Sequence, residues 1–170
     1  MEIVVASTAP GAPAVTWPGR LARCAIGRGG IRPDKHEGDG ATPAGRFLLR
    51  QVMYRPDRLA RPQAQLPLRP LAAADGWCDD PLDAAYNRLV RLPHPARCER
   101  LWRADALYDL LIVVGYNDEP VVPGRGSAIF IHVAAAGYAP TEGCVALALP
   151  DLLDLAAGAG PGDTLVTAPP

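Results

Sequence analysis

His132 and Cys144 are the two side chains of this sequence whose types and spacing most clearly suggest covalent chemistry. The histidine lies near the end of an apolar run, and the cysteine follows it on the chain beside Gly143. An imidazole within hydrogen-bond reach can accept the proton of a thiol, and a protonated imidazole lowers the pKa of that thiol. Gly143 lets the backbone approach a substrate carbonyl, and N–H groups at such a turn can form an oxyanion hole. The pair therefore predicts nucleophilic catalysis by cysteine.

Plainer interpretations of the same residues stay open at this point. A histidine in an apolar strand is commonly a packed core residue, and a cysteine beside glycine is commonly a small buried apolar one. A metal site that combines His132 and Cys144 with a further histidine has no specific ligand spacing behind it. No two of the cysteines Cys24, Cys78, Cys98 and Cys144 are spaced as C-x-x-C, so we expect free thiols, no metal and no cofactor.

The chain between His132 and Cys144 has to reverse for the two side chains to meet. Fully extended, it would separate them by about 40 Å. Residues 134–141 are mostly small and can fold back as a loop. We expect a strand at residues 127–133 to carry the histidine and an apolar segment at 143–149 to follow the cysteine.

The remaining pattern predicts one β-dominated domain over residues 1–170. Hydrophobic residues make up 49% and charged residues 21%, and the 17 Gly and 19 Pro favour short strands and loops. The run at residues 107–116 is apolar on both faces and predicts a central strand. Further strands are expected at residues 3–7, 23–27, 46–54, 86–90 and 163–167, and turns or irregular segments at 10–13, 56–70 and 76–81. A brief helix or loop is expected at 100–106, and a helix at 151–157 with Asp151 as its cap and Gly158 at its end.

The charge of the chain excludes strong electrostatic partners. The net charge of −1 gives no attraction to nucleic acid or to an anionic membrane. No apolar run is long enough to span a bilayer, and the first residues lack the pattern of a signal peptide. From the sequence as written we expect a soluble, unexported monomer.

Two motifs resemble those of the L,D-transpeptidase (YkuD) family. Thr141-Glu142-Gly143-Cys144, which follows the strand with His132, is similar to that family's His…[Ser/Thr]-x-Gly-Cys motif. Residues 38–47 resemble its Thr-Pro-x-Gly-x-Phe element, and the order of the motifs agrees. The resemblance implies a β-sandwich or flattened barrel of mixed strands with one or two short helices.

The chain also departs from the family pattern at two positions. Glu142 stands where many members carry His, and Ala146 stands where many carry Arg or Asn. The loop between His132 and Cys144 is also short for the family. These departures suggest an atypical subgroup.

The resemblance implies a specific reaction on peptidoglycan stem peptides or muropeptides at the cell envelope. Cys144 would attack the bond before a terminal D-Ala, release D-Ala and leave a thioester, which an amine of a second stem would resolve into a cross-link. His132 would move the proton, held by the carbonyl of Val133, and the N–H groups of Gly143 and Cys144 would bind the oxyanion.

Other residues are weaker candidates for binding the substrate. Thr141 and Glu142 flank the nucleophile, Ser127 and Arg125 could hold a carboxylate, and Trp77 and Tyr138 could line a groove. The plainer expectation is that Trp77 is core, Tyr138 anchors a loop and Arg125 is solvated. Asp79 and Asp80 could bind an amine, and the plainer expectation is that they form a turn. His36 and His94 are expected to be exposed, and the other three cysteines to be structural.

Three alternative functions follow from the same residues. Water as the acceptor would make the protein an L,D-carboxypeptidase. The domain could instead be a non-catalytic module that binds peptidoglycan fragments. A disulfide-stapled secreted domain is disfavoured, because a chain of this length can bury a sufficient core without staples.

Overall fold

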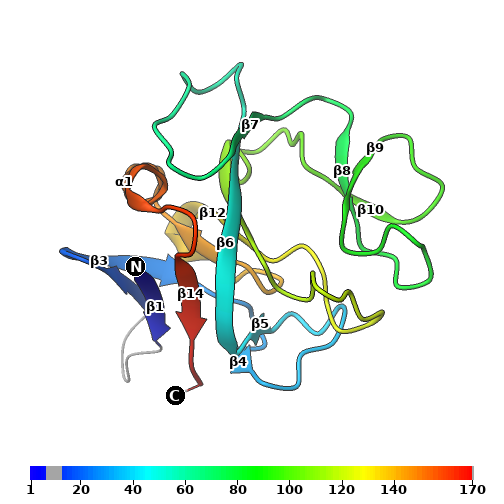
Figure 1. Ribbon diagram of the computed structural model, residues 1–170, viewed down its shortest axis with the longest axis horizontal. Coiled ribbons are helices and arrows are strands. Elements are labelled where there is room, and N and C mark those ends of the chain that lie inside the picture. The colour runs from blue at the N-terminus through cyan, green and yellow to red at the C-terminus, as the bar shows by residue number, and fades with distance from the viewer. Residues whose placement is uncertain (7–12, 170) are drawn as a thin grey trace.

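A closed, mixed β-sheet forms the body of the protein in the computed structural model, which describes residues 1–6 and 13–169 (Figure 1). The sheet has nine strands in the order β11-β12-β13-β3-β2-β1-β14-β6-β7. Its strands are β1 (Glu2–Ala6), β2 (Ala14–Trp17), β3 (Arg20–Ala25), β6 (Gly45–Tyr54), β7 (Leu68–Pro70), β11 (Leu110–Val114), β12 (Phe130–Val133), β13 (Val145–Leu147) and β14 (Thr164–Thr167).

The long strand β6 closes the sheet into a barrel. It pairs antiparallel with β14 along its first half and with β11 along its second half, so the two ends of the sheet meet on one strand. Parallel pairing of β1 with β14 joins the two ends of the chain in the same wall. A closed sheet leaves few unpaired strand edges, which protects it from pairing with other chains.

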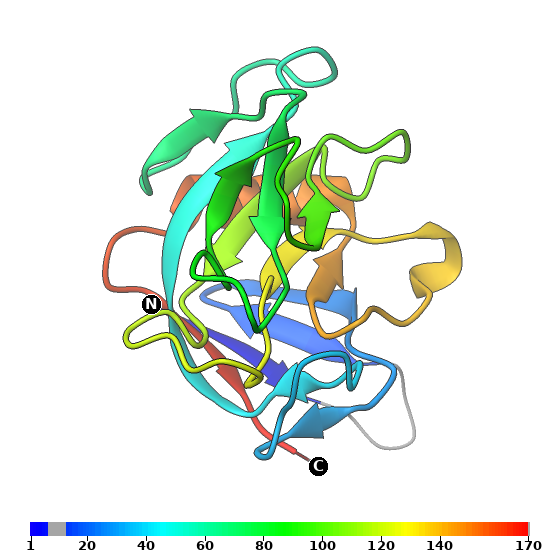
Figure 2. The ribbon, with the colours of Figure 1, turned by 90° about the vertical axis from the view of Figure 1, so that its right-hand side faces the viewer.

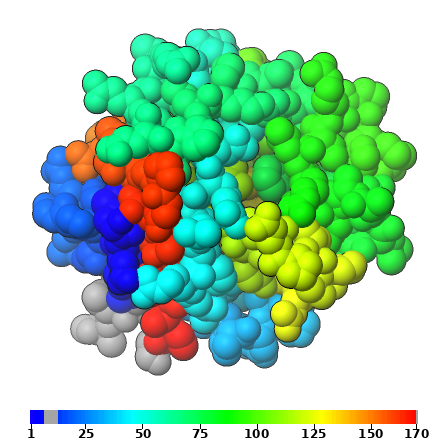
Figure 3. All heavy atoms as spheres, in the orientation of Figure 1, coloured from blue at the N-terminus to red at the C-terminus, as the bar shows by residue number. Residues whose placement is uncertain are grey.

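A smaller sheet packs on one side of the barrel. It consists of β8 (Asp75–Cys78), β9 (Leu89–Arg91) and β10 (Cys98–Arg100), in the order β10-β8-β9. Figure 2 shows this sheet in green in front of the barrel, and Figure 3 shows the same region beside the yellow loop that follows β11. The two-residue strands β4 (Ile31–Arg32) and β5 (Thr42–Pro43) pair with each other at the barrel's lower end in Figure 1.

Strand β11 separates two hydrophobic cores. Leu110, Ile112 and Val114 face the barrel core, whereas Leu111 and Val113 face a second core under the small sheet. Because side chains alternate along a strand, a strand buried on both faces needs a continuous apolar run. The prediction of a two-faced central strand is confirmed.

The one α-helix among the described residues, α1 (Leu149–Gly158), packs on the barrel core through Leu152, Leu155 and Ala156. The predicted helix and its end at Gly158 are confirmed, but its predicted start and cap are wrong. The capping position is Ala148, which makes no side-chain cap, and Asp151 lies inside the first turn. There its carboxylate still faces the positive end of the helix dipole.

The mainly-β fold and the mixed, barrel-like sheet agree with the expectation from the sequence. The strand expected at residues 86–90 begins only at Leu89, and the turn expected at 76–81 is largely the strand β8. Residues 56–70 end in β7, which was expected to be irregular. Residue 7 of the first expected strand and residues 10–12 of the first expected turn lie outside the described residues. None of the described helices is both long and apolar enough to cross a membrane.

Candidate active site

Parallel pairing of β12 with β13 brings His132 and Cys144 into one site. His132 lies opposite Ala146 in the register, and Cys144 immediately precedes β13. The connecting loop reverses the chain through a short 3₁₀ helix, η1 (Ala136–Tyr138). The fold-back that the sequence required is therefore present.

Both side chains lie on the face of the sheet that is turned toward the small sheet. Phe130 and Cys144 belong to the second core, and His132 follows Phe130 with the period of two that keeps strand residues on one face. The ring of Tyr108 packs edge-on against His132, with 5.3 Å between the ring centroids. The imidazole is thus fixed between the sheet and an aromatic ring.

The thiol of Cys144 is held by backbone groups. Its Sγ lies 3.2 Å from the carbonyl oxygen of Ala128, to which it donates, and 3.3 Å from the amide nitrogen of Phe130, from which it accepts. Within the described residues no hydrogen bond joins the thiol to His132. The thiol is therefore held by the backbone and is not hydrogen-bonded to the imidazole.

The imidazole of His132 is oriented by the strand that carries it. Nδ1 lies 2.9 Å from the carbonyl oxygen of Val133, to which it donates a hydrogen bond. This contact requires the proton on Nδ1 of the neutral ring, which leaves Nε2 as an acceptor. Nε2 is the nitrogen that can take up a proton.

Burial keeps both groups neutral. It raises the pKa of the Cys144 thiol to about 12, with a further rise from the charge of Glu99. Burial also lowers the pKa of His132 to about 4, against the effect of the hydrogen bond to Val133. A thiol and a neutral imidazole therefore face the cavity near pH 7.

The turn before Cys144 is organised by the hydroxyl of Thr141. Its Oγ1 donates to the carbonyl oxygen of Cys144 at 2.6 Å and accepts from the amide of Gly143 at 3.1 Å. The N–H of Gly143 is therefore engaged by Thr141 in this structure, and its role as an oxyanion donor stays a prediction. The N–H of Cys144 has no acceptor among the described residues.

The Thr-Pro loop lies directly beneath this turn. Gly143 has φ of +136°, and a Cβ built on it would lie 2.7 Å from the carbonyl oxygen of Ala41. Thr42 accepts a hydrogen bond from the amide of Gly27, and Gly27 forms a bridge with Thr141. The two sequence motifs, far apart on the chain, thus support each other in space.

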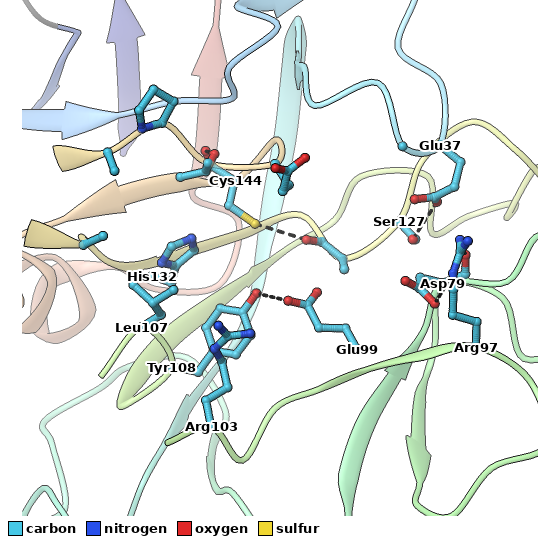
Figure 4. A pocket seen from close by; sticks show the side chains of 17 residues that line it. Glu37, Asp79, Arg97, Glu99, Arg103, Leu107, Tyr108, Ser127, His132 and Cys144 are labelled. Atoms are coloured by element: carbon cyan, nitrogen blue, oxygen red, sulfur yellow. Dashed lines mark hydrogen bonds and ion pairs between the residues drawn. The ribbon is translucent and has the colours of Figure 1, made fainter. Parts of the chain in front are cut away.

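His132 and Cys144 line one side of a cavity of about 610 Å³. Figure 4 shows Glu37, Ser127, Asp79 and Arg97 on the opposite side, with Glu99 between the two groups. The full lining consists of Glu37, Gly38, Asp79, Arg97, Glu99, Arg103, Leu107, Tyr108, Ser127, Ala128, His132, Ala135, Ala139, Pro140, Thr141, Glu142 and Cys144. Carboxylates and guanidinium groups together make this a wall suited to a zwitterionic or peptide ligand.

Four hydrogen-bonded pairs hold the charged and polar side chains on the side of the cavity opposite His132 and Cys144, which we call the polar wall. Ser127 donates to Glu37 at 2.7 Å, and Arg97 donates from Nε to Asp79 at 3.0 Å. Tyr108 donates to the carboxylate of Glu99 at 2.6 Å, where burial raises the pKa of Glu99. Arg103 donates to Asp105 at the rim. These pairs keep the charged groups in place before a ligand arrives.

Only some of the residues predicted to bind substrate line the cavity. Ser127, Thr141 and Glu142 line the cavity together with His132 and Cys144, and Glu142 forms an exposed ion pair with Arg28. Trp77 and Tyr138 do not lie on the cavity wall.

Trp77, Arg125 and Tyr138 lie away from this cavity, in the plainer roles expected for them, whereas the exposure expected for His94 is wrong. Trp77 is buried in the second core, where it packs against Phe130, and Arg125 is exposed beside a different hollow. The guanidinium of Arg23 lies over the ring of Tyr138, which anchors the η1 loop. His94 was expected to be exposed and is mostly buried, with 21% of its side chain accessible.

Most of the acidic and basic side chains on the cavity side opposite His132 and Cys144 were missed by sequence reasoning. Glu37, Arg97, Glu99 and Arg103 come from loops and from a strand of the small sheet. Their segments carry no periodic pattern, and only the pairing of distant strands brings them to the cavity. Of the pair Asp79 and Asp80, for which amine binding was the weaker and a turn the plainer expectation, Asp79 lines the cavity.

Comparison with protein families gives one match. The model for the L,D-transpeptidase catalytic domain, YkuD, matches residues 5–167. Comparisons with curated proteins and with solved structures gave no match.

Proposed function

Because the chain belongs to the L,D-transpeptidase catalytic domain family, we propose that it is a cysteine acyltransferase that acts on peptidoglycan stem peptides at the cell envelope. The observation that supports this most directly is the placement of Cys144 and His132 on one cavity wall, with the N–H of Cys144 free among the described residues. Transfer of an acyl group needs these three elements: a nucleophile, a base and an oxyanion donor.

In the first half-reaction, Sγ of Cys144 attacks the carbonyl carbon of the bond that precedes D-Ala. The thiol proton passes to Nε2 of His132 as the carbon–sulfur bond forms, and the N–H of Cys144 stabilises the oxyanion. The carbon–nitrogen bond then breaks, the imidazolium returns the proton to the leaving amine of D-Ala, and a thioester remains.

In the second half-reaction, an amine of another stem peptide attacks the thioester. The new carbon–nitrogen bond forms, the carbon–sulfur bond breaks, and His132 relays a proton from the amine to the departing sulfur. The product is a cross-link and the thiol is restored. Water in place of the amine would give a trimmed tripeptide stem and an L,D-carboxypeptidase.

The polar wall suits the charged ends of a stem peptide. Glu37, Asp79 and Glu99 can accept hydrogen bonds from an ammonium group, and Arg97 and Arg103 can donate to a carboxylate. A stem with a diamino acid and a terminal carboxylate carries both kinds of group. The proposal assigns recognition to this wall and chemistry to the opposite one.

The test is to incubate the protein with tetrapeptide muropeptides and to follow protein and products by mass spectrometry. The wild type should gain an acyl adduct on the Cys144 peptide and release D-Ala, and Cys144→Ala should do neither. Cys24→Ala is the matched control, because Cys24 is a buried cysteine of the barrel core that does not line the cavity.

The products then identify the acceptor. Cross-linked dimers support transpeptidation, and tripeptides alone support the hydrolytic alternative. A folded, reduced wild type that forms no adduct and releases no D-Ala would overturn the proposal and favour a binding module.

A further inference from the structure

Cys78, His94 and Cys98 form a compact cluster that does not line the active-site cavity. Their sulfur and nitrogen ligand atoms all lie within 4.8 Å of one another. Cys78 ends β8 and Cys98 begins β10, directly opposite each other in the antiparallel register. His94 reaches the pair from the loop between β9 and β10.

We propose that this cluster is a Zn²⁺ site with two thiolate ligands and one imidazole ligand. Zinc takes sulfur at about 2.3 Å and nitrogen at about 2.0 Å in tetrahedral geometry, which places the ligand atoms about 3.5–3.8 Å apart. The cluster already brings its ligand atoms to within about 1 Å of that spacing. Small side-chain rotations would complete it.

A carboxylate oxygen of Asp83 lies beside the cluster. Oδ1 of Asp83 lies 3.4 Å from Nε2 of His94. A carboxylate at this place can serve as a fourth ligand or orient the imidazole, a partner that metal-bound histidines ordinarily have. Two sulfur atoms and a nitrogen favour zinc over magnesium or calcium, which prefer oxygen.

The burial of the three ligands permits entry of an ion. Cys78 is fully buried, whereas His94 and Cys98 are partly exposed. An ion can therefore enter from solvent and bind against a rigid strand end. The sequence led to the expectation of no metal because the ligands lack a C-x-x-C turn; strand pairing and a long loop bring them together instead.

The proposed ion would stiffen one wall of the active-site cavity. Asp79 follows Cys78, and Arg97 and Glu99 flank Cys98 on the chain, and all three line the cavity. Fixing both strand ends with one ion would fix these three side chains relative to each other. This consequence is separate from the metal binding, which does not depend on the proposed catalytic function.

The test uses full-length Cys144→Ala protein, so that the catalytic thiol cannot bind metal. The protein is reduced, freed of metal with a chelator and titrated anaerobically with Co²⁺ and then with Zn²⁺. We expect about one Co²⁺ per chain with the absorption of tetrahedral thiolate coordination, and displacement of Co²⁺ by Zn²⁺. Bound Zn²⁺ should also raise the melting temperature, because it binds the folded state.

Variants of the cluster identify the ligands. Cys98→Ser and His94→Ala, made in the same background, should each weaken Zn²⁺ binding by about 100-fold or more and abolish the thermal shift. Cys98 and His94 are partly exposed, so these chains should fold, which circular dichroism checks. Cys24→Ser and His36→Ala are matched controls at a buried cysteine and an exposed histidine outside the cluster, and should bind as the parent does.

Three results would overturn the proposal. The first is a folded, reduced parent without tetrahedral cobalt absorption. The second is binding that is unchanged in Cys98→Ser. The third is protein whose Cys78 and Cys98 form a disulfide that excludes metal under the reducing conditions of the titration.

Discussion

Cys144 and His132 are held as a neutral thiol and a neutral imidazole. Burial favours the neutral form of both groups, the thiol also donates to the Ala128 carbonyl, and the bond from Nδ1 to the Val133 carbonyl fixes the tautomer of the ring while opposing the effect of burial on its pKa. A preformed thiolate would be exposed to oxidation, whereas a buried thiol is protected. In the proposed mechanism the substrate therefore has to draw the thiol away from Ala128 toward Nε2 before attack.

The buried imidazole should make the fold sensitive to acid. The pKa of His132 is about 4 in the folded protein, against 6.5 for an ordinary histidine. As the pH falls below 6.5 the unfolded chain takes up the proton first, so stability is fully present above pH 6.5 and is lost as the pH falls toward 4. We expect the protonation of His132 to lower the free energy of unfolding by about 3 kcal/mol over that pH range.

Urea unfolding between about pH 7 and pH 4 measures this cost. The free energy of unfolding of the wild type should fall by about 3 kcal/mol more than that of His132→Gln. His36→Gln serves as the control, since His36 is largely exposed, and should follow the wild type. Parallel pH profiles for wild type and His132→Gln would contradict the assignment of a buried neutral imidazole.

At the scale of elements, the turn at Gly143 depends on contact with the Thr-Pro loop. Gly143→Ala places a side chain at φ of +136°, against the carbonyl of Ala41. We expect it to lower the free energy of unfolding by about 3 kcal/mol or more and to reduce acylation sharply. Chemical denaturation and the muropeptide assay measure the two effects.

Gly137 offers a matched control in the same connecting loop. It has φ of +69°, and a Cβ built on it would meet nothing within 4 Å. Gly137→Ala should therefore cost only about 1 kcal/mol, the conformational part of the effect. Equal costs at both positions would show that close packing on the Thr-Pro loop contributes nothing.

The features that could be predicted from the sequence are those with a local sequence signal. Cys144, His132 and β11 carry local signals: a motif, a periodicity and an apolar run. The short strands β8 and β10 carry none, because their few residues are defined by cross-strand partners. The sequence alone therefore could not predict the polar wall beside that sheet or the cluster of Cys78 with Cys98, because both depend on which strands pair.

Asn87 connects the small sheet to the strand that carries the histidine. Its Oδ1 accepts from Trp77 Nε1 at 2.9 Å and from the amide of Ala128 at 3.1 Å, and its Nδ2 donates to the carbonyl oxygens of Tyr116 and Asn117. It also has a positive φ of 56°, which asparagine tolerates better than most residues. One buried side chain thus forms hydrogen bonds with four polar groups from three segments of the chain.

Asn87→Ala should be strongly destabilising. It leaves buried donors without acceptors, so we expect the free energy of unfolding to fall by about 3 kcal/mol. Arg88→Ala, at the neighbouring exposed position, should change it by less than about 1 kcal/mol. Denaturant titration of the wild type, Asn87→Ala and Arg88→Ala measures these free energies of unfolding. A small decrease in Asn87→Ala would mean that water replaces the asparagine in this network.

At the scale of the whole molecule, a line of contacts joins the C-terminal strand to the nucleophile. Thr167 donates to the carbonyl of Pro43 and accepts from the amide of Gly45 at 3.1 Å, so β14 supports the Thr-Pro loop. That loop in turn contacts the turn at Gly143. The closed barrel therefore makes the two ends of the chain part of the support of the active site.

Thr167→Val tests whether this support reaches the site. Valine keeps the shape but loses both hydrogen bonds, so we expect the free energy of unfolding to fall by about 1–2 kcal/mol. If the loop transmits the effect, a double-mutant cycle with Thr141→Val should give a coupling of about 0.5 kcal/mol or more in acylation. Thr164→Val, on the same strand but bonded to Arg46, should show additive effects with Thr141→Val. Additivity for Thr167→Val as well would mean that β14 stabilises the barrel without positioning Cys144.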